Sequence, residues 1–222
     1  MTRVGFFDSG IGGTSILNAF KSLCPEVDTV YIADTENCPY GNKPKEKIIE
    51  LSRRNVEKLL EKGCDIVVIA CNTATAAAVD VLREEYPDVV FVGMEPAVKP
   101  AALNSKTGII AVLATQGTFN GRLYQETSKR FAKDITLIAT VADEFVELVE
   151  RGETSGKKVE EIVRRRVEPL VASGADHIVL GCTHFPHLKK VIEQVVAGRA
   201  EIVDPSYAVA KRIKALIADF QK

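Results

Sequence analysis

Two cysteines, Cys71 and Cys182, stand at equivalent places in the chain, each directly after an apolar run and before polar residues. The pKa of a thiol can be tuned to near neutrality, so one thiol can be a base while the other keeps its proton. Two such groups facing each other across a substrate could take a proton from one face of an α-carbon and deliver one to the other. Without a cofactor to accept electrons, the carbanion needs nearby hydrogen-bond donors and exclusion of water. The pair therefore predicts a cofactor-independent racemase.

Polar residues beside each thiol could support this chemistry. Cys71 is expected near the N-terminus of a helix, where the helix dipole and free amides stabilise a thiolate. Asn72 and Thr73 could cap that helix or hydrogen-bond a substrate carboxylate or ammonium group. His184 could act as a general acid or base, or tune the thiol of Cys182. The alternative for Cys71 is a small buried apolar residue, which describes most isolated cysteines.

A glycine-rich turn, DSGIGGT at residues 8–14, follows the first expected strand. Its glycines allow a tight turn, and the helix that follows would direct its N-terminal amides toward an anion. The turn does not fit the GxGxxG pattern, and its acidic residue, Asp8, precedes the turn instead of following about 20 residues later. We therefore expect no dinucleotide. A plain structural turn is the alternative, and it leaves Asp8 and Ser9 without a role.

Other chemistries explain the segment around Cys182 less well. One cysteine with His184 and His187 lacks the spacing of the usual zinc motifs, so we expect no metal. A cysteine hydrolase needs one nucleophile and one base, and it leaves the matched Cys71 without a function. A non-catalytic protein that binds acidic amino acids has no use for two matched thiols.

An internal repeat places both thiols. Residues 53–71 and 164–182 align with a constant offset of 111, so that helix, glycine, aspartate, strand and cysteine recur in order. A weaker match pairs Asp8 with Thr115. The alternative is that helix, glycine, aspartate and strand form a common α/β motif that recurs by chance. This explains the shared glycine and apolar strand but not a cysteine at both strand ends. We therefore predict two similar halves.

Short β-branched runs alternate with amphipathic helical stretches, which is typical of βα units and parallel sheets. We predict an α/β fold with two pseudo-symmetric domains and mainly parallel sheets. The active site is expected in the cleft between the domains, because ligands of parallel sheets bind at the carboxyl ends of the strands. The expected strands are residues 4–7, 29–33, 66–70, 89–92, 108–113, 135–139, 177–180 and 201–203. The expected helices include residues 45–62, 74–85, 124–131, 157–173, 187–196 and 207–220.

Composition limits the classes of partner. The 222 residues are 46% hydrophobic and 27% charged, with a formal net charge of −1. Such a balance offers no basic surface for nucleic acid and no polybasic anchor for a membrane. The N-terminal residues lack the regions of a signal peptide, so we expect a cytoplasmic protein with reduced cysteines. Of these, Cys24 and Cys64 are expected to be structural, and Cys38 to lie in a turn.

Several ordered motifs resemble those of the glutamate racemase family, from residue 5 to about residue 205. They are FDSGIGG at 7–13, Asp34 with PYG at 39–41, ACNTA at 70–74, GMEPA at 93–97, VERG at 149–152 and GCTHFP at 181–186. The resemblance implies interconversion of L- and D-glutamate without a cofactor, supplying D-glutamate for bacterial peptidoglycan and thus for cell-wall biogenesis and cell shape. Aspartate or another amino acid is the alternative substrate.

The resemblance also implies roles for particular residues. Cys71, assisted by Asp8, would take the proton from D-glutamate, and Cys182, assisted by His184, would take it from L-glutamate. Glu150 matches a further acidic residue of the family's active site. The residues implied to bind substrate are Ser9, Tyr40, Gly41, Asn72, Thr73 and Thr183.

The implied domains are residues 1–95 with 207–222, on the side of the first thiol, and residues 96–206, on the side of the second. The helix at 207–220 is expected to return to the first domain, and a homodimer is the expected assembly. The chain departs from the family pattern in being short, and in having Phe185 and His187 where Tyr and Leu are more usual.

Overall fold

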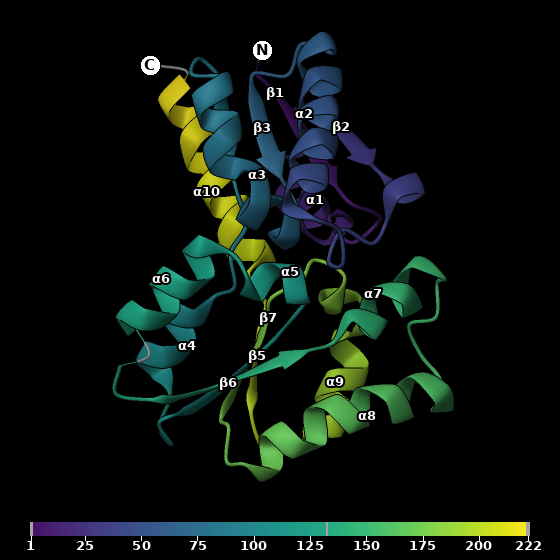
Figure 1. Cartoon of the computed structure of the whole chain (residues 1–222), viewed down its shortest axis with the longest axis vertical. Helices are drawn as coiled ribbons and strands as arrows, with labels where there is room; N and C mark the ends of the chain where they lie inside the picture. Colours follow the sequence, from purple (N-terminus) through teal and green to yellow (C-terminus); the bar gives the residue numbers. More distant parts are fainter. Residues whose placement is uncertain (1, 132, 221–222) are drawn as a thin grey trace.

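The chain folds into two lobes, each built on a parallel four-stranded sheet (Figure 1). The computed structural model describes residues 2–131 and 133–220. The sheet of the first lobe, in the order β2-β1-β3-β4, consists of β1 (Arg3–Asp8), β2 (Asp28–Ala33), β3 (Ile66–Ile69) and β4 (Val90–Val92). The sheet of the second lobe, in the order β6-β5-β7-β8, consists of β5 (Ile109–Ala114), β6 (Thr136–Val141), β7 (His177–Leu180) and β8 (Glu201–Val203).

The two sheets have the same strand order, which confirms the predicted α/β class and the pseudo-symmetry of its halves. Gly63 and Gly174 precede the inner strands β3 and β7, and both have positive φ angles, 71° and 86°. Glycine adopts this conformation at no steric cost, which explains its place at both helix ends. Asp65 and Asp176 follow, and each accepts a backbone N–H at the start of the neighbouring central strand or just before it.

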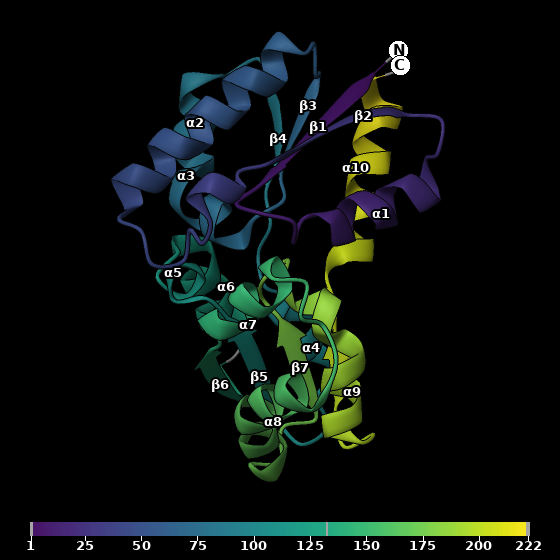
Figure 2. The ribbon, with the colours of Figure 1, turned by 90° about the vertical axis from the view of Figure 1, so that its right-hand side faces the viewer.

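Helices cover both faces of the first sheet, because its central strands are apolar on both faces. Helices α1 (Thr14–Leu23) and α10 (Ser206–Phe220) pack on one face, and α2 (Lys45–Glu61) and α3 (Asn72–Glu85) pack on the other (Figure 2). Alternation along β1 shows the division: Phe6 packs with α1 and α10, whereas Phe7 packs with α2 and α3. The C-terminal helix α10 therefore returns to the first lobe, as predicted.

The second sheet is covered in the same way. Leu113 of β5 packs on one side with α7 (Asp143–Glu150), α8 (Lys157–Ala172) and α9 (Lys189–Val196). Val112 faces the other side, with α4 (Val98–Asn104) and α6 (Arg122–Phe131), while the short helix α5 (Gln116–Phe119) faces the first lobe. Each lobe thus has its own core on both sides of its sheet.

The segment between β7 and α9 differs from its expected structure. A 3-10 turn, η2 (Phe185–Leu188), precedes α9, so the prediction that a helix starts at His187 was wrong. The fully buried Phe185 packs edge-on against Phe145 at a ring-centroid distance of 5.2 Å, which explains an aromatic residue there.

The residue limits of the two domains stay a prediction, and residues 1, 132, 221 and 222, which that prediction includes, lie outside the described residues. Among the helices of residues 2–131 and 133–220, none has the length and apolar character needed to cross a membrane.

Candidate active site

Both predicted thiols line one small cavity between the lobes. Cys71 directly precedes α3, Cys182 follows β7, and both are buried. Four larger hollows on the outside of the described chain contain none of the predicted site residues. The walls come from both lobes: Ser9, Pro39, Tyr40, Gly41, Cys71, Asn72, Thr73, Thr115, Val146, Cys182, Thr183 and His184.

Cys71 caps the N-terminus of α3 with its sulfur. Its Sγ accepts a hydrogen bond from the backbone N–H of Ala74 at 3.4 Å, and its thiol donates to Oγ of Ser9 at 3.7 Å. Burial raises the pKa of Cys71, the negative charge of Asp8 raises it further, and the bond from Ala74 only partly offsets them. The protein by itself therefore holds this thiol in its protonated form.

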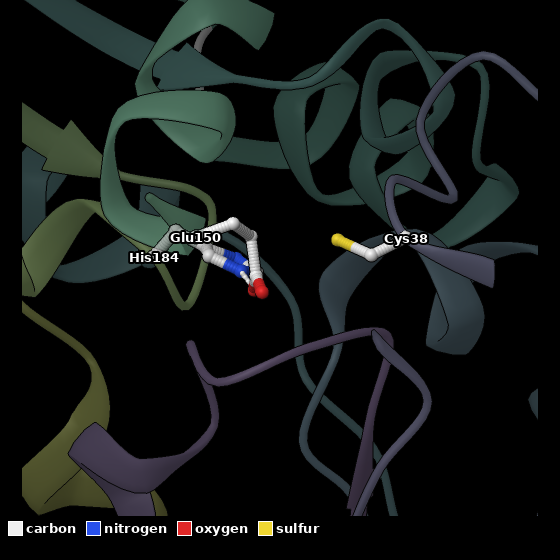
Figure 3. A group of neighbouring side chains, drawn as sticks. All are labelled: Cys38, Glu150 and His184. Atoms are coloured by element: carbon white, nitrogen blue, oxygen red, sulfur yellow. Dashed lines mark hydrogen bonds and ion pairs between the residues drawn. The ribbon is translucent and has the colours of Figure 1, made fainter. Parts of the chain in front are cut away.

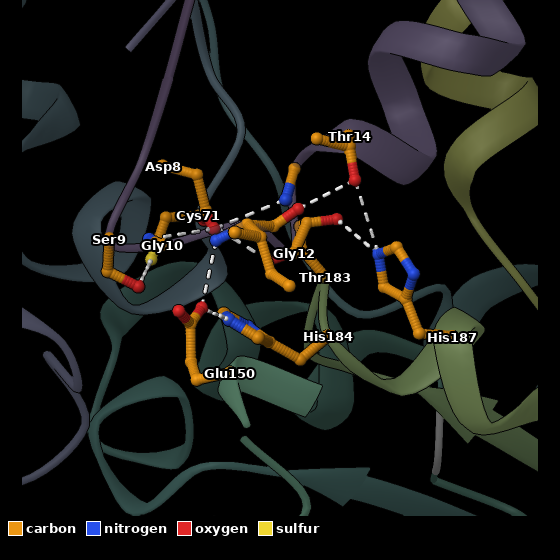
Figure 4. Close-up of polar contacts among 12 residues, drawn as sticks. Asp8, Ser9, Gly10, Gly12, Thr14, Cys71, Glu150, Thr183, His184 and His187 are labelled. Atoms are coloured by element: carbon orange, nitrogen blue, oxygen red, sulfur yellow. Dashed lines mark hydrogen bonds and ion pairs between the residues drawn. The ribbon is translucent and has the colours of Figure 1, made fainter. Parts of the chain in front are cut away.

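Asp8, at the end of β1, is fully buried and has three hydrogen-bond donors (Figure 4). The backbone N–H groups of Gly10 and Gly13 donate to Oδ2, each at 3.2 Å, and Oγ1 of Thr183 donates to Oδ1 at 3.2 Å. Burial raises the pKa of Asp8, although the nearby His184 and these donors oppose the rise. This carboxylate also joins the two lobes, because Thr183 belongs to the second.

The glycine-rich turn therefore does not act as the sequence suggested. Asp8 occupies two of its amides, and a third, from Ile11, donates to Oε1 of Glu150 at 2.8 Å. The expectation that the amides of this turn face a bound anion is corrected, since three of them bind carboxylates of the chain itself. Asp8, the acidic residue that argued against a dinucleotide, thus accepts hydrogen bonds from the amides of the turn that follows it.

His184 lies between a carboxylate and the second thiol. Its Nε2 is 2.5 Å from Oε1 of Glu150, and its Nδ1 is 3.8 Å from Sγ of Cys182. Burial lowers the pKa of His184, but hydrogen bonds with Cys182, Cys38 and Glu150 outweigh it, so the pKa is raised well above its usual value. Conversely, the pKa of Glu150 is lowered, because bonds from His184 and Ile11 overcome its burial. The pair is an imidazolium and a carboxylate.

Tyr40 lines the cavity, but its hydroxyl is used elsewhere. This hydroxyl donates to Oδ2 of Asp34 at 2.5 Å, and the amide of Asn55 lies 3.3 Å from both oxygens. Burial raises the pKa of Asp34, but the bonds from Tyr40, Asn37 and Asn55 lower it overall. These hydrogen bonds hold the segment of residues 39–41 in place. Its half-buried residues, Pro39 and Gly41, form the more exposed wall of the cavity.

Asn72 has an unusual environment for a buried amide. Its side chain lines the cavity and is 3% exposed, yet neither polar atom has a hydrogen-bond partner among the described residues. An unpaired buried polar group costs about 1–3 kcal/mol, so such a group at a cavity wall indicates a ligand that supplies the partners.

A hydroxyl cluster joins the lobes beside the cavity and includes residues that the sequence analysis missed. Oγ1 of Thr73 lies 2.8 Å from Oγ1 of Thr115, which lies 3.0 Å from Oγ1 of Thr118. Thr115 lines the cavity directly after β5, whereas Asp8 is the last residue of the equivalent strand β1. The weak sequence match between Asp8 and Thr115 was the signal that could have found it.

The model of the family described as Asp/Glu/Hydantoin racemase matches residues 15–213, most of the chain and nearly all of both lobes. The chain belongs to this racemase family. It is therefore an isomerase, and the family predicted from the sequence motifs is confirmed.

Curated relatives of this racemase agree over nearly the whole chain. The glutamate racemase of Herpetosiphon aurantiacus is 45% identical over 97% of this chain and 84% of its own length. The glutamate racemase of Ectopseudomonas mendocina is 41% identical over 98% of this chain and 83% of its own. Both are somewhat longer than this racemase, which is short for its family, as noted from the sequence.

Solved structures of glutamate racemases share its two-lobed fold. The Escherichia coli enzyme, in complex with L-glutamate and the activator UDP-MurNAc-Ala, has a TM-score of 0.90 and 34% identity, covering 98% of this chain and 82% of that one. The Francisella tularensis enzyme, in complex with D-glutamate, has a TM-score of 0.85 and 27% identity, covering 99% and 82%.

Proposed function

We propose that this racemase interconverts L- and D-glutamate by proton transfer between Cys71 and Cys182. The observation that carries the proposal is that both thiols, at matching places in the two lobes, line one cavity. We further propose that it acts in the cytoplasm, supplies D-glutamate for peptidoglycan, and assembles as a homodimer with the domain limits expected above. The glutamate complexes and names of its relatives support the choice of substrate.

The proposed reaction moves one proton on and one proton off. Starting from D-glutamate, the thiolate of Cys71 takes the α-proton, and the electron pair of the broken C–H bond stays on the α-carbon. The thiol of Cys182 then gives its proton to the opposite face, yielding L-glutamate. Cys71 ends as a thiol and Cys182 as a thiolate, ready for the reverse reaction.

The surroundings of the two thiols carry opposite charges. An imidazolium on His184 places positive charge 3.8 Å from Sγ of Cys182. Cys71 has the carboxylate of Asp8 nearby instead, and its raised pKa keeps it protonated. In the proposed mechanism, Asp8 assists by taking the Cys71 proton, because its own pKa is raised by burial.

The substrate groups are proposed to bind along the polar walls. The unpaired amide of Asn72 can both donate to a carboxylate and accept from an ammonium group. Ser9, Thr73 and Thr183 add hydroxyls, and Tyr40 with Gly41 adds ring and backbone surface, since the tyrosine hydroxyl is bonded to Asp34.

The test is proton NMR of the protein with L-glutamate in D₂O, beside the Cys71→Ser and Cys182→Ser variants. α-Deuterium is expected in D-glutamate, and net inversion should fall by at least about 100-fold in each variant. Cys24→Ser, which changes a buried thiol far from the cavity, is the matched control and should keep its activity.

Other outcomes separate the alternatives. Inversion of aspartate but not glutamate would move the substrate to another amino acid. A hydrolytic activity that survives loss of Cys71 would favour a cysteine hydrolase. Glutamate binding without exchange of the α-hydrogen would leave only a binding protein.

A further inference from the structure

Three side chains with different metal-binding atoms converge beside the cavity: Cys38, Glu150 and His184 (Figure 3). A thiol sulfur, a carboxylate oxygen and an imidazole nitrogen all lie within 4.8 Å of one another. The Cys38 sulfur points toward the pair formed by the other two. Cys38 belongs to the first lobe and the other two to the second, and only His184 is fully buried.

We propose that this trio binds one Zn²⁺ ion and that the bound ion inhibits the enzyme. Cysteine sulfur, histidine nitrogen and glutamate oxygen are the three protein ligands of zinc, at about 2.3, 2.0–2.1 and 2.0–2.2 Å. Ligand atoms around one such ion lie about 3–4 Å apart, so shifts of about 1 Å suffice to form the site. Glu150 Oε1 and His184 Nε2, now 2.5 Å apart, must separate to admit the ion.

The charges of the trio match the ion. A thiolate at Cys38 and a carboxylate at Glu150 balance the two positive charges of Zn²⁺, with His184 as a neutral ligand. The site is thus neutral overall, which suits a half-buried position, where uncompensated charge is costly. Binding releases the thiol proton of Cys38 and one proton of the His184 imidazolium to solvent.

The proposed inhibition follows from the residues that the ion would bind, and it rests on the proposed function. Zinc at Nε2 breaks the contact with Glu150 that fixes the His184 ring, whose other nitrogen lies 3.8 Å from Sγ of Cys182. Through Cys38, the ion also ties the adjoining segment of Pro39 to the second lobe. That segment forms the more exposed wall of the cavity, so substrate access narrows.

Sequence spacing does not predict this site. No metal was expected from the sequence, because the residues around Cys182 lack the usual zinc spacing, and the proposed site departs from that expectation. The trio takes only His184 from that segment. It adds Glu150, 34 positions earlier, and Cys38, 146 positions earlier. Only the docking of the lobes brings the three together.

Binding is tested first without substrate, by isothermal titration calorimetry with Zn²⁺ and by the thiolate-to-metal absorption of bound Co²⁺. About one ion per chain is expected, with affinity at least about 100-fold lower in Cys38→Ala, since loss of even an outer partner of a metal ligand costs 10- to 100-fold. Cys24→Ala, the matched control, should bind as the unaltered protein does. Equal affinity in Cys38→Ala would overturn the site.

A second variant excludes the catalytic thiols as ligands. The double variant Cys71→Ser/Cys182→Ser should bind Zn²⁺ within about threefold of the unaltered protein, because the trio is intact. Loss of tight binding in this variant would place the ion between the two thiols and refute the proposed site.

Inhibition is then measured as the rate of glutamate racemisation against Zn²⁺ concentration. The unaltered enzyme should be inhibited, with recovery on adding EDTA, while Cys38→Ala should be active and need about 100-fold more zinc. Binding at Cys38 without any effect on racemisation would overturn the inhibitory role. Zinc binding by a protein that racemises nothing would instead refute the proposed function and leave the site standing.

Discussion

Oε1 of Glu150 lies 2.5 Å from Nε2 of His184 and so fixes the ring whose other nitrogen faces Cys182. The carboxylate, the imidazole and the thiol form a chain from the end of α7 to the end of β7. Because Glu150 also accepts the N–H of Ile11, this chain connects the second thiol to the glycine-rich turn of the first lobe. The protonation of His184 thus depends on how the lobes dock.

Replacing Glu150 by Gln should change how the activity depends on pH. Without the carboxylate, the raised pKa of His184 falls toward its ordinary value, so the imidazolium is lost at lower pH. We expect kcat/KM for L-glutamate to fall by about 10- to 100-fold near neutral pH, within the range of general acid–base effects, and its alkaline limb to move to lower pH. The measurement is the pH profile of kcat/KM.

Glu147→Gln is the matched control, since Glu147 is an exposed residue of the same helix that pairs with Arg151. Its profile should overlay that of the unaltered enzyme. A Glu150→Gln enzyme that is slower with an unmoved alkaline limb would mean that Glu150 only supports the fold.

Asp8→Asn should make the protein more stable and less active. The pKa of Asp8 is raised in the folded chain, so the folded state keeps the carboxyl proton to higher pH than the unfolded state does. The free energy of unfolding therefore falls as pH rises from about 4 through the folded pKa. Asn removes this penalty, and it can still accept from Gly10 and Gly13 and donate to Thr183. We expect a Tm higher by about 2–4 °C at pH 7 for each kcal/mol relieved, with racemisation strongly reduced.

Calorimetry across pH checks this result, with Asp8→Ala as the comparison. The alanine variant leaves two buried N–H groups without acceptors and should unfold at lower temperature than the unaltered protein. An Asp8→Asn protein that melts lower at pH 7 and equally at acid pH would show that the ionised carboxylate stabilises the fold.

Much of the fold was accessible from the sequence because its signals are local. The eight expected strands all occur, since runs such as residues 66–69 are apolar and β-branched throughout. The repeat placed Cys71 and Cys182 after equivalent strands of the two lobes. Both residues line the same cavity once the lobes dock. Periodicity and pairing therefore sufficed for the two thiols.

The rest of the site depends on contacts between distant segments, which no local pattern encodes. No sequence pattern placed His187 near the first lobe, yet its Nε2 lies 3.3 Å from the carbonyl oxygen of Gly12. Likewise, the amides of the glycine-rich turn meet carboxylates instead of a ligand, because Glu150 arrives from 139 residues beyond Ile11. A motif shows which groups are present, whereas docking decides which partners they take.

Asn72→Ala should separate ligand binding from folding, because the amide has no partner among the described side chains and backbone. Removing an unpaired buried polar group relieves a cost of about 1–3 kcal/mol, which offsets the packing lost with the side chain. The Tm of the free protein should therefore stay within about 2–4 °C of the unaltered value. The KM for glutamate should rise by about 10- to 100-fold, the loss of one or two hydrogen bonds to charged groups.

Asn55→Ala is the matched control, because Asn55 is equally buried but donates to Asp34 and Tyr40. It should lower the Tm more than Asn72→Ala does, since a buried carboxylate loses a donor. Thermal unfolding and steady-state kinetics of both variants decide the matter. An Asn72→Ala protein with an unchanged KM would show that the amide does not bind substrate, and a large fall in its Tm would show that it supports the fold.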